Sequence, residues 1–179
     1  MKRSTPQAAH DPLATDEADP SREEPAGIRR LYNRPGFLLR RAHQISVSLF
    51  MEATPDFGVT TTQYGVLLIL HHFEGLDQIS LAKKVGLDRS TTGLVLKKLE
   101  HKGLVVRTND PGDLRRKIIV LTARGERLLA KLTGPAARAQ DAAFEPFTRT
   151  EAQQFIALLK RFVEHYNAST RAPIVEEDD

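Results

Sequence analysis

One stretch of the sequence decides the fold class that we expect: QISLAKKVGLDRSTTGLVLKKLEHKGLVVRTNDPGDLRRKIIVLT, residues 78–122. Its first part places apolar residues at helical spacing, namely Ile79, Leu81, Ala82 and Val85. Gly86 is expected to end this short helix, because glycine accepts the left-handed backbone of a helix C-terminus. Asp88 is a favourable N-cap for a second helix, which should continue to about Lys102 before Gly103.

The pattern then changes from helix to strand. Residues 104–107 and 117–121 are short apolar runs, and the residues at 110–113, Asp-Pro-Gly-Asp, form a strong turn signal between them. Two helices in close succession followed by a β-hairpin have the element order of a winged helix-turn-helix. We therefore predict a mostly α-helical fold with a small β-hairpin wing.

Two further helices are predicted before this stretch. Pro35 suits the first position of a helix, because its fixed φ matches the helix and its missing N–H is not needed there. That helix should end near Thr54. Thr60 and Gln63 have the spacing of a capping box, so a second helix should begin at Thr60 or Thr61 and end near Gly75.

Two more helices are predicted after the hairpin. Thr122 should cap a long helix, and Gly134-Pro135 should kink or interrupt it because proline removes a helical hydrogen bond. Thr150 and Gln153 form a possible second capping box at the start of the last helix. Its apolar face is expected to consist of Phe155, Ile156, Leu159, Phe162, Val163 and Tyr166.

The two ends of the chain differ in composition from its body. Residues 1–27 carry six acidic and three basic residues, residues 171–179 carry four acidic and one basic, and both segments have few large apolar groups. We expect both to be disordered, because they cannot bury enough surface to offset the entropy of ordering. The remaining body, residues 28–170, then has a net charge of +9 against +3 for the whole chain. A basic body indicates a polyanionic partner such as nucleic acid, although ordinary surface solvation is an equal alternative.

The composition also excludes several classes of protein. The chain has no cysteine, which excludes disulfides and thiolate chemistry and is typical of a cytoplasmic protein. It has no apolar run of membrane-spanning length and no secretory signal, so no membrane association is expected. There is no nucleophile motif, no glycine-rich phosphate loop and no paired carboxylates in an apolar framework. We expect neither an enzyme nor a bound cofactor.

The second helix of the quoted stretch has two different faces. Thr92, Val95, Leu96 and Leu99 should point inward, whereas the outward residues are Arg89, Ser90, Thr91, Gly93, Leu94, Lys97 and Lys98. An α-helix fits the major groove of DNA, so we predict that this outer face contacts phosphates and base edges. Taken alone, Ser90 and Thr91 are more often simple helix-start residues, and the two lysines a solvated face.

The hairpin is also basic. Its DNA-binding candidates are Arg107, Asp113, Arg115 and Arg116. A β-ribbon can place an arginine in the minor groove, where narrow A·T tracts attract cations. We expect Asp113 to hold Arg115 in a fixed pose.

The motifs of this stretch resemble the MarR family of bacterial transcriptional regulators. The resemblance covers about residues 35–168 and is carried by Ile79-Ser80-Leu81-Ala82, Leu87-Asp88-Arg89-Ser90-Thr91, residues 99–107, Asp110-Pro111-Gly112-Asp113-Leu114-Arg115, and Leu121-Thr122-Ala123-Arg124-Gly125. The opening PGFLLRRAHQ, residues 35–44, is similar to members that govern catabolism of aromatic acids, including nicotinate-pathway repressors. Gly93 and Leu94 depart from the family, which usually has a polar residue and an arginine there.

The resemblance implies an intertwined homodimer that binds a pseudo-palindromic site on double-stranded DNA as a repressor. The DNA-binding lobe would comprise about residues 60–122, and the dimerisation helices residues 35–54 and 123–168. It also implies release by a small aromatic carboxylate, such as a hydroxylated benzoate or nicotinate. Arg40, His43 and Tyr64 are the candidate effector-binding residues, because a cation, an imidazole and a phenol can clasp such an acid. Taken alone, Arg40 is more often a surface ion-pair partner, and His43 is more often a satisfied core or interface histidine.

Two other functions remain open from the sequence. One is a regulator that responds to a metal or to another ligand, although the six histidines show no recognised ligand spacing and we expect no metal site. The other is a winged helix used only for protein assembly. The basic recognition face argues against assembly alone, and a gel shift would distinguish the two.

Overall fold

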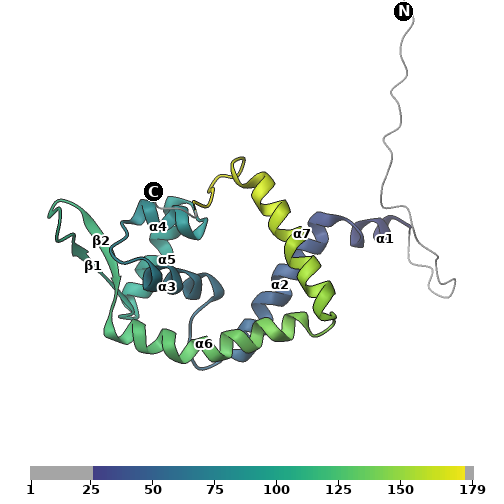
Figure 1. Ribbon diagram of the computed structural model, residues 1–179, viewed down its shortest axis with the longest axis horizontal. Coiled ribbons are helices and arrows are strands. Elements are labelled where there is room, and N and C mark those ends of the chain that lie inside the picture. Colours follow the sequence, from purple (N-terminus) through teal and green to yellow (C-terminus); the bar gives the residue numbers. More distant parts are fainter. Residues whose placement is uncertain (1–25, 176–179) are drawn as a thin grey trace, which may run out of the picture. The chain divides into compact units, whose positions relative to one another are not determined.

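The computed structural model describes residues 26–175 of the 179-residue chain, and residues 1–25 and 176–179 lie outside it. Its elements, labelled in Figure 1, are α1 Ala26–Tyr32, α2 Pro35–Ala53, α3 Thr61–His72, α4 Gln78–Val85, α5 Arg89–His101, β1 Val105–Asn109, β2 Lys117–Leu121, α6 Ala123–Phe144 and α7 Arg149–Asn167. The predicted mostly helical fold with one β-hairpin is confirmed. Contacts divide the chain into a unit up to Arg40 and a unit from Arg41, and the second unit contains the winged helix.

The core of the second unit lies where α3, α4, α5, the hairpin and α6 meet. Leucines and other aliphatic residues from each element are fully buried there, among them Leu67, Leu81, Leu96, Leu99, Ile119 and Leu132. Burying one such side chain stabilises a fold by about 1.5–3 kcal/mol. The core therefore fixes the inner face of α5 and leaves its outer face in solvent.

The hairpin is antiparallel, with Val105 paired to Leu121 and Asn109 paired to Lys117 at its two ends. It is joined to the segment before α4 by a bridge in which the N–H of Ile119 donates to the carbonyl of Leu76 at 2.8 Å. Thr122 caps α6 by accepting from the N–H of Gly125 at 3.0 Å, as predicted. The wing is thus connected to the first helix of the helix-turn-helix as well as to α6.

The structure corrects two sequence predictions at the C-terminal helices, namely the interruption of α6 at Gly134-Pro135 and the capping box of α7. Helix α6 runs without interruption through Pro135, and the residue four positions earlier, Lys131, lies on the exposed side where water can replace the lost hydrogen bond. The capping box of α7 is Thr148 with Glu151 rather than Thr150 with Gln153. The Glu151 carboxylate accepts from the Thr148 N–H at 2.8 Å, and a charged acceptor makes the stronger bond.

The ends of the described chain also differ from expectation. Helix α1 was not predicted, and its first residues fall within the segment that we expected to be disordered. Residues 171–175 were expected to share the disorder of the tail, but they have defined contacts with α4 and α7. The expectation for residues 1–25 and 176–179 lies outside the described residues. Within residues 26–175, no helix combines the length and apolarity needed to cross a bilayer.

Candidate nucleic-acid interface

The start of α5 is organised by the Asp88 carboxylate. Its Oδ1 accepts from the backbone N–H of Thr91 at 2.9 Å and from the Ser90 hydroxyl at 2.5 Å, and its Oδ2 accepts from the Thr91 hydroxyl at 2.6 Å. The hydrogen bonds from the Ser90 and Thr91 side chains, followed by that from the Thr91 backbone, hold the pKa of Asp88 well below its usual value. Ser90 and Thr91 therefore serve the helix start, whatever else they contact.

The two faces of α5 are arranged as predicted. Thr92, Leu96 and Leu99 are buried, whereas Arg89, Ser90, Lys97 and Lys98 are exposed. Leu94 is 64% exposed, although it is apolar and surrounded by polar and basic positions on that face. An isolated exposed leucine on a basic helix face has the chemistry to contact the methyl group of thymine.

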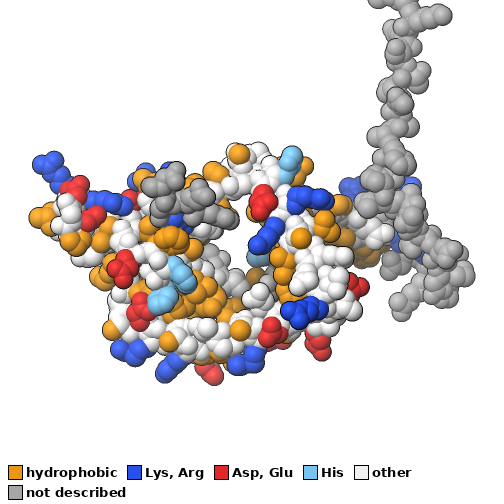
Figure 2. Space-filling view, viewed as in Figure 1, with side chains coloured by type: hydrophobic (Ala, Val, Ile, Leu, Met, Phe, Trp, Pro, Cys, Tyr) orange, Lys and Arg blue, Asp and Glu red, His pale blue; other side chains and the backbone are white. Residues whose placement is uncertain are grey.

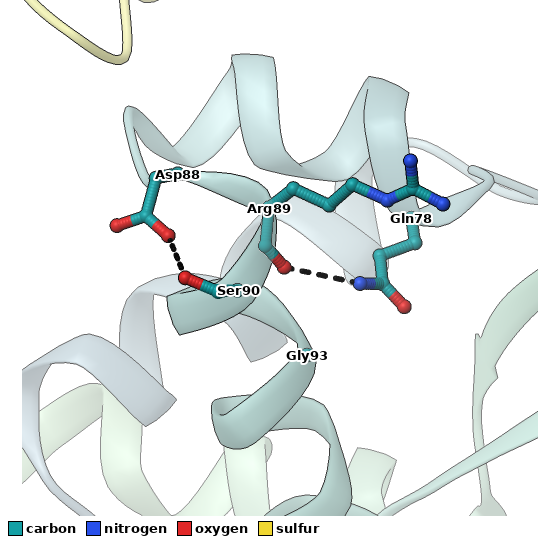
Figure 3. Close-up of a pocket in the computed structure, with 5 residues that line it drawn as sticks. All are labelled: Gln78, Asp88, Arg89, Ser90 and Gly93. Carbon is teal, nitrogen blue, oxygen red and sulfur yellow. Dashed lines mark hydrogen bonds between the residues drawn. The ribbon is translucent and has the colours of Figure 1, made fainter.

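A concavity of about 580 Å³ lies where α4 meets the first turn of α5 (Figure 3). It is lined by Gln78, Asp88, Arg89, Ser90 and Gly93. The Gln78 amide donates to the Arg89 carbonyl at 3.2 Å, and a Cβ on Gly93 would lie 3.2 Å from the same amide nitrogen. Gly93 lies on the predicted DNA-binding face, and the structure adds that a glycine there leaves room for Gln78.

The wing arginines have different partners. Arg107 is paired with Glu100 of α5 at 2.7 Å, and Arg116 contacts both Asp77 at 2.9 Å and Asp110 at 3.4 Å. Asp113 accepts from the backbone N–H of Arg115 at 3.0 Å, so it positions the Arg115 backbone rather than the guanidinium. Within residues 26–175, the Arg115 guanidinium has no acceptor and remains available to a phosphate.

Arg116 joins the wing to the helix-turn-helix. Asp77 is the N-cap of α4 and accepts from the N–H groups of Ile79 and Ser80, each at 2.9 Å. Burial raises the pKa of Asp77, but the bonds from Ser80 and Ile79 and the contact with Arg116 outweigh burial and lower it overall. One carboxylate therefore orients both the start of α4 and the hairpin. Figure 2 shows Lys and Arg side chains extending outward at the far end of that hairpin.

The effector candidates lie on two helices. Arg40 and His43 are on α2, and Tyr64 is on α3, where its ring centroid lies 5.4 Å from that of Phe50. Burial raises the pKa of Tyr64, so its phenol stays protonated and can donate a hydrogen bond. The concavity beside α5 is not lined by any of these three residues.

Sequence reasoning missed several residues of these sites. Asp77 and Gln78 were not singled out, although an Asp before an apolar helical run is a common N-cap signal. A second concavity of about 310 Å³ was also missed; it is lined by Asp56, Phe57, Arg124, Arg127, Leu128 and Lys131. Its residues come from the loop before α3 and from one face of α6, and nothing in the sequence brings those segments together. Among the described residues, no group of three His, Cys, Asp or Glu is placed to hold a metal ion.

Comparisons with known proteins agree with this geometry. A family model described as MarR family matches residues 59–117. A putative transcriptional regulatory protein for the hcr operon of Thauera aromatica is 37% identical over 128 residues, covering 70% of this chain and 76% of that protein.

Two solved structures extend the comparison. The structure of BpsR from Bordetella bronchiseptica, described as regulated in its DNA binding by 6-hydroxynicotinic acid, has a TM-score of 0.68 and 27% identity, covering 73% of this chain and 94% of that one. A transcriptional repressor, CouR, bound to a 23-mer DNA duplex, has a TM-score of 0.70 and 28% identity, covering 80% of this chain and 99% of that one.

Proposed function

Because the chain belongs to the MarR family of transcriptional regulators, we propose that it is a repressor that binds a pseudo-palindromic operator as a homodimer and is released by a small aromatic acid. Members of this family are regulators of transcription and not enzymes. The observation that carries the proposal is the exposed outer face of α5 next to a wing whose Arg115 guanidinium has no acceptor within the described residues.

In the proposed complex, the outer face of α5 enters the major groove. Arg89, Lys97 and Lys98 contact phosphates, and Leu94 meets a thymine methyl group. Ser90, Thr91 and Gly93 lie at the N-terminal end of the same face, where the backbone N–H groups favour an anion. Arg115 enters the minor groove, while Arg107, Asp113 and Arg116 hold the hairpin in position.

The dimer is supported by the apolar face of α7. No residue of this helix is buried, yet Phe155, Ile156, Leu159, Phe162, Val163 and Tyr166 repeat at helical spacing and are each 38% to 50% exposed. A continuous apolar stripe of this size on a helix is typical of an interaction surface. In a two-fold dimer, two copies of α5 would read half-sites about one helical turn apart.

We expect Arg115→Ala to weaken binding to all duplexes and to lower the slope of log affinity against log salt concentration by about 1, because one cation that neutralises the phosphate charge beside the groove is lost. Arg116→Ala is the matched control: it removes a neighbouring cation that is already paired with Asp77 and Asp110. The salt dependence of Arg116→Ala should therefore differ less from that of wild type than the salt dependence of Arg115→Ala does. The measurement is a fluorescence anisotropy titration at several salt concentrations, and an unchanged Arg115→Ala slope would contradict the assigned contact.

The effector is proposed to be an aromatic carboxylate bound by Arg40, His43 and Tyr64. An arginine binds a carboxylate through two hydrogen bonds, and the protonated Tyr64 phenol can donate to the ring substituent or the acid. The response of the similar BpsR to 6-hydroxynicotinic acid supports an acid of this class.

We expect 6-hydroxynicotinic acid or a hydroxylated benzoate to release the protein from DNA and to bind Arg40→Ala at least about tenfold more weakly than wild type, because a charge-assisted pair is lost. Isothermal titration calorimetry on Arg40→Ala and His43→Ala checks this. Wild-type affinity in both variants would remove these residues from the site. If the protein binds DNA tightly and no acid releases it, aromatic acids are not its effectors. If it binds no duplex more tightly than random DNA, a role in protein assembly is favoured instead.

A further inference from the structure

The chain after α7 returns to the helix-turn-helix (Figure 1). Asn167, the last residue of α7, closes this segment with two side-chain hydrogen bonds to a single residue. Its Nδ2 donates to the Ile174 carbonyl at 2.8 Å, and its Oδ1 accepts from the Ile174 N–H at 2.8 Å. One residue later, the Val175 N–H donates to the Lys83 carbonyl of α4 at 3.2 Å. We refer to residues 167–175 as the C-terminal strap.

The Val175 bond completes the end of α4. The last carbonyls of a helix have no partner within it, and α4 ends at Val85. The N–H groups of Gly86 and Leu87 both donate to the Ala82 carbonyl, which leaves the Lys83 carbonyl to be paired from outside the helix. The strap supplies that donor.

The side chain of Ile174 occupies space that a glycine leaves open. Gly86, with φ of 65°, forms the turn between α4 and α5, and a Cβ built on it would lie 2.8 Å from Cγ1 of Ile174. Ile174 is half-buried in this contact, whereas the adjacent Val175 side chain is 44% exposed. The strap therefore docks through one specific side chain at the turn that sets the angle between α4 and α5.

From these contacts, we infer that the C-terminal strap positions the helix-turn-helix relative to α7, with Asn167 and Ile174 as positioning residues for operator binding. This inference rests on the proposed function, in which α7 forms the dimer and α5 binds DNA. Since α7 has no buried residue of its own, the strap is a direct link between its C-terminal end and the DNA-binding helices. In a dimer, that link would restrict the distance and angle between the two copies of α5.

The test compares Ile174→Ser with its matched control, Val175→Ser, in the full-length chain. Both replace an aliphatic side chain in the strap by serine, but only Ile174 fills the space at Gly86. Asn167→Ala is a second variant, which removes both side-chain hydrogen bonds to Ile174 and keeps a good helix former at the end of α7. The DNA probes are a duplex selected by the wild-type protein from a random pool and the same duplex with its half-sites moved apart by one base pair.

We expect Ile174→Ser and Asn167→Ala to bind the selected duplex about threefold to tenfold more weakly than wild type, which is a typical size for a positional coupling. Both should discriminate less between the two spacings, because their recognition helices are less restricted. Amide hydrogen exchange in the α4–α5 turn, measured without DNA, should be faster in both variants. Val175→Ser should match wild type in affinity, spacing preference and exchange.

The outcomes are distinguishable. If exchange, affinity and spacing preference in Ile174→Ser equal those of wild type, or if exchange rises while affinity and spacing preference stay the same, the inference is wrong. If wild type selects no duplex at all, the proposed function fails and the positioning role fails with it; the exchange measurement then still decides whether the strap docks at Gly86.

Discussion

Leu94→Asp is expected to weaken operator binding by about a hundredfold while leaving the protein folded. Leu94 is 64% exposed at the centre of the outer face of α5, so its loss removes little buried area, and surface substitutions usually change stability by less than about 0.5 kcal/mol. In the proposed complex, a carboxylate at this position would face the phosphates and base edges of the major groove. Like charges brought together at an interface cost several kcal/mol, and about 1.4 kcal/mol corresponds to a factor of ten.

The matched control is Leu94→Met, which keeps an apolar side chain of similar size and should bind within about threefold of wild type. Anisotropy titrations with the selected duplex measure both affinities, and thermal unfolding checks that both variants are folded. If Leu94→Asp bound as tightly as Leu94→Met, the outer face of α5 would not be the DNA-binding surface.

Gly125→Ala is expected to destabilise the protein by about 3 kcal/mol or more, which is the upper end of the usual cost of adding a methyl group to a packed core. Gly125 is buried in the first turn of α6, and a Cβ there would lie 2.2 Å from the backbone carbonyl oxygen of Leu104. That carbonyl also accepts from the Thr122 N–H at 3.0 Å, so neither the strand nor the helix can shift without breaking the contact that joins them. The two atoms nearest to the added methyl group belong to the Leu104 backbone rather than to a flexible side chain.

Gly65→Ala is the matched control for Gly125→Ala. Gly65 is also inside a helix, α3, but a Cβ there meets nothing within 4 Å. Alanine is the better helix former by about 1 kcal/mol, so this variant should be more stable than wild type. Urea unfolding of the three proteins gives the comparison, and a Gly125→Ala midpoint equal to that of wild type would show that the contact at Leu104 is not restrictive.

The elements that the sequence predicts best are those with a strong local period. The inner and outer faces of α5 follow from the helical spacing of Thr92, Leu96 and Leu99 alone, and the hairpin follows from two apolar runs around a turn. Capping residues are local as well, but the sequence prediction took Thr150 rather than Thr148 as the start of α7. Only the structure shows that Glu151 makes the stronger partner for Thr148.

The features that could not be predicted depend on residues far apart in the sequence. Arg116 and Asp77 are 39 residues apart, and their ion pair joins the wing to α4, a role for Arg116 that the sequence does not indicate. Ile174 lies after α7, in a segment whose composition alone predicts disorder, yet it packs against Gly86 in the turn between α4 and α5. Such contacts arise from how the elements pack, which a single sequence does not specify.

The carboxylate of Asp88 also limits which bases the first turn of α5 can recognise through hydrogen bonds. While it accepts the hydroxyl hydrogens of both Ser90 and Thr91, these two side chains can offer a base only their oxygen lone pairs. In the major groove, hydrogens to match those lone pairs come from the amino groups of adenine and cytosine, whereas guanine and thymine present acceptors there. On the DNA strand that it faces, the first turn of α5 should therefore favour adenine or cytosine over guanine or thymine.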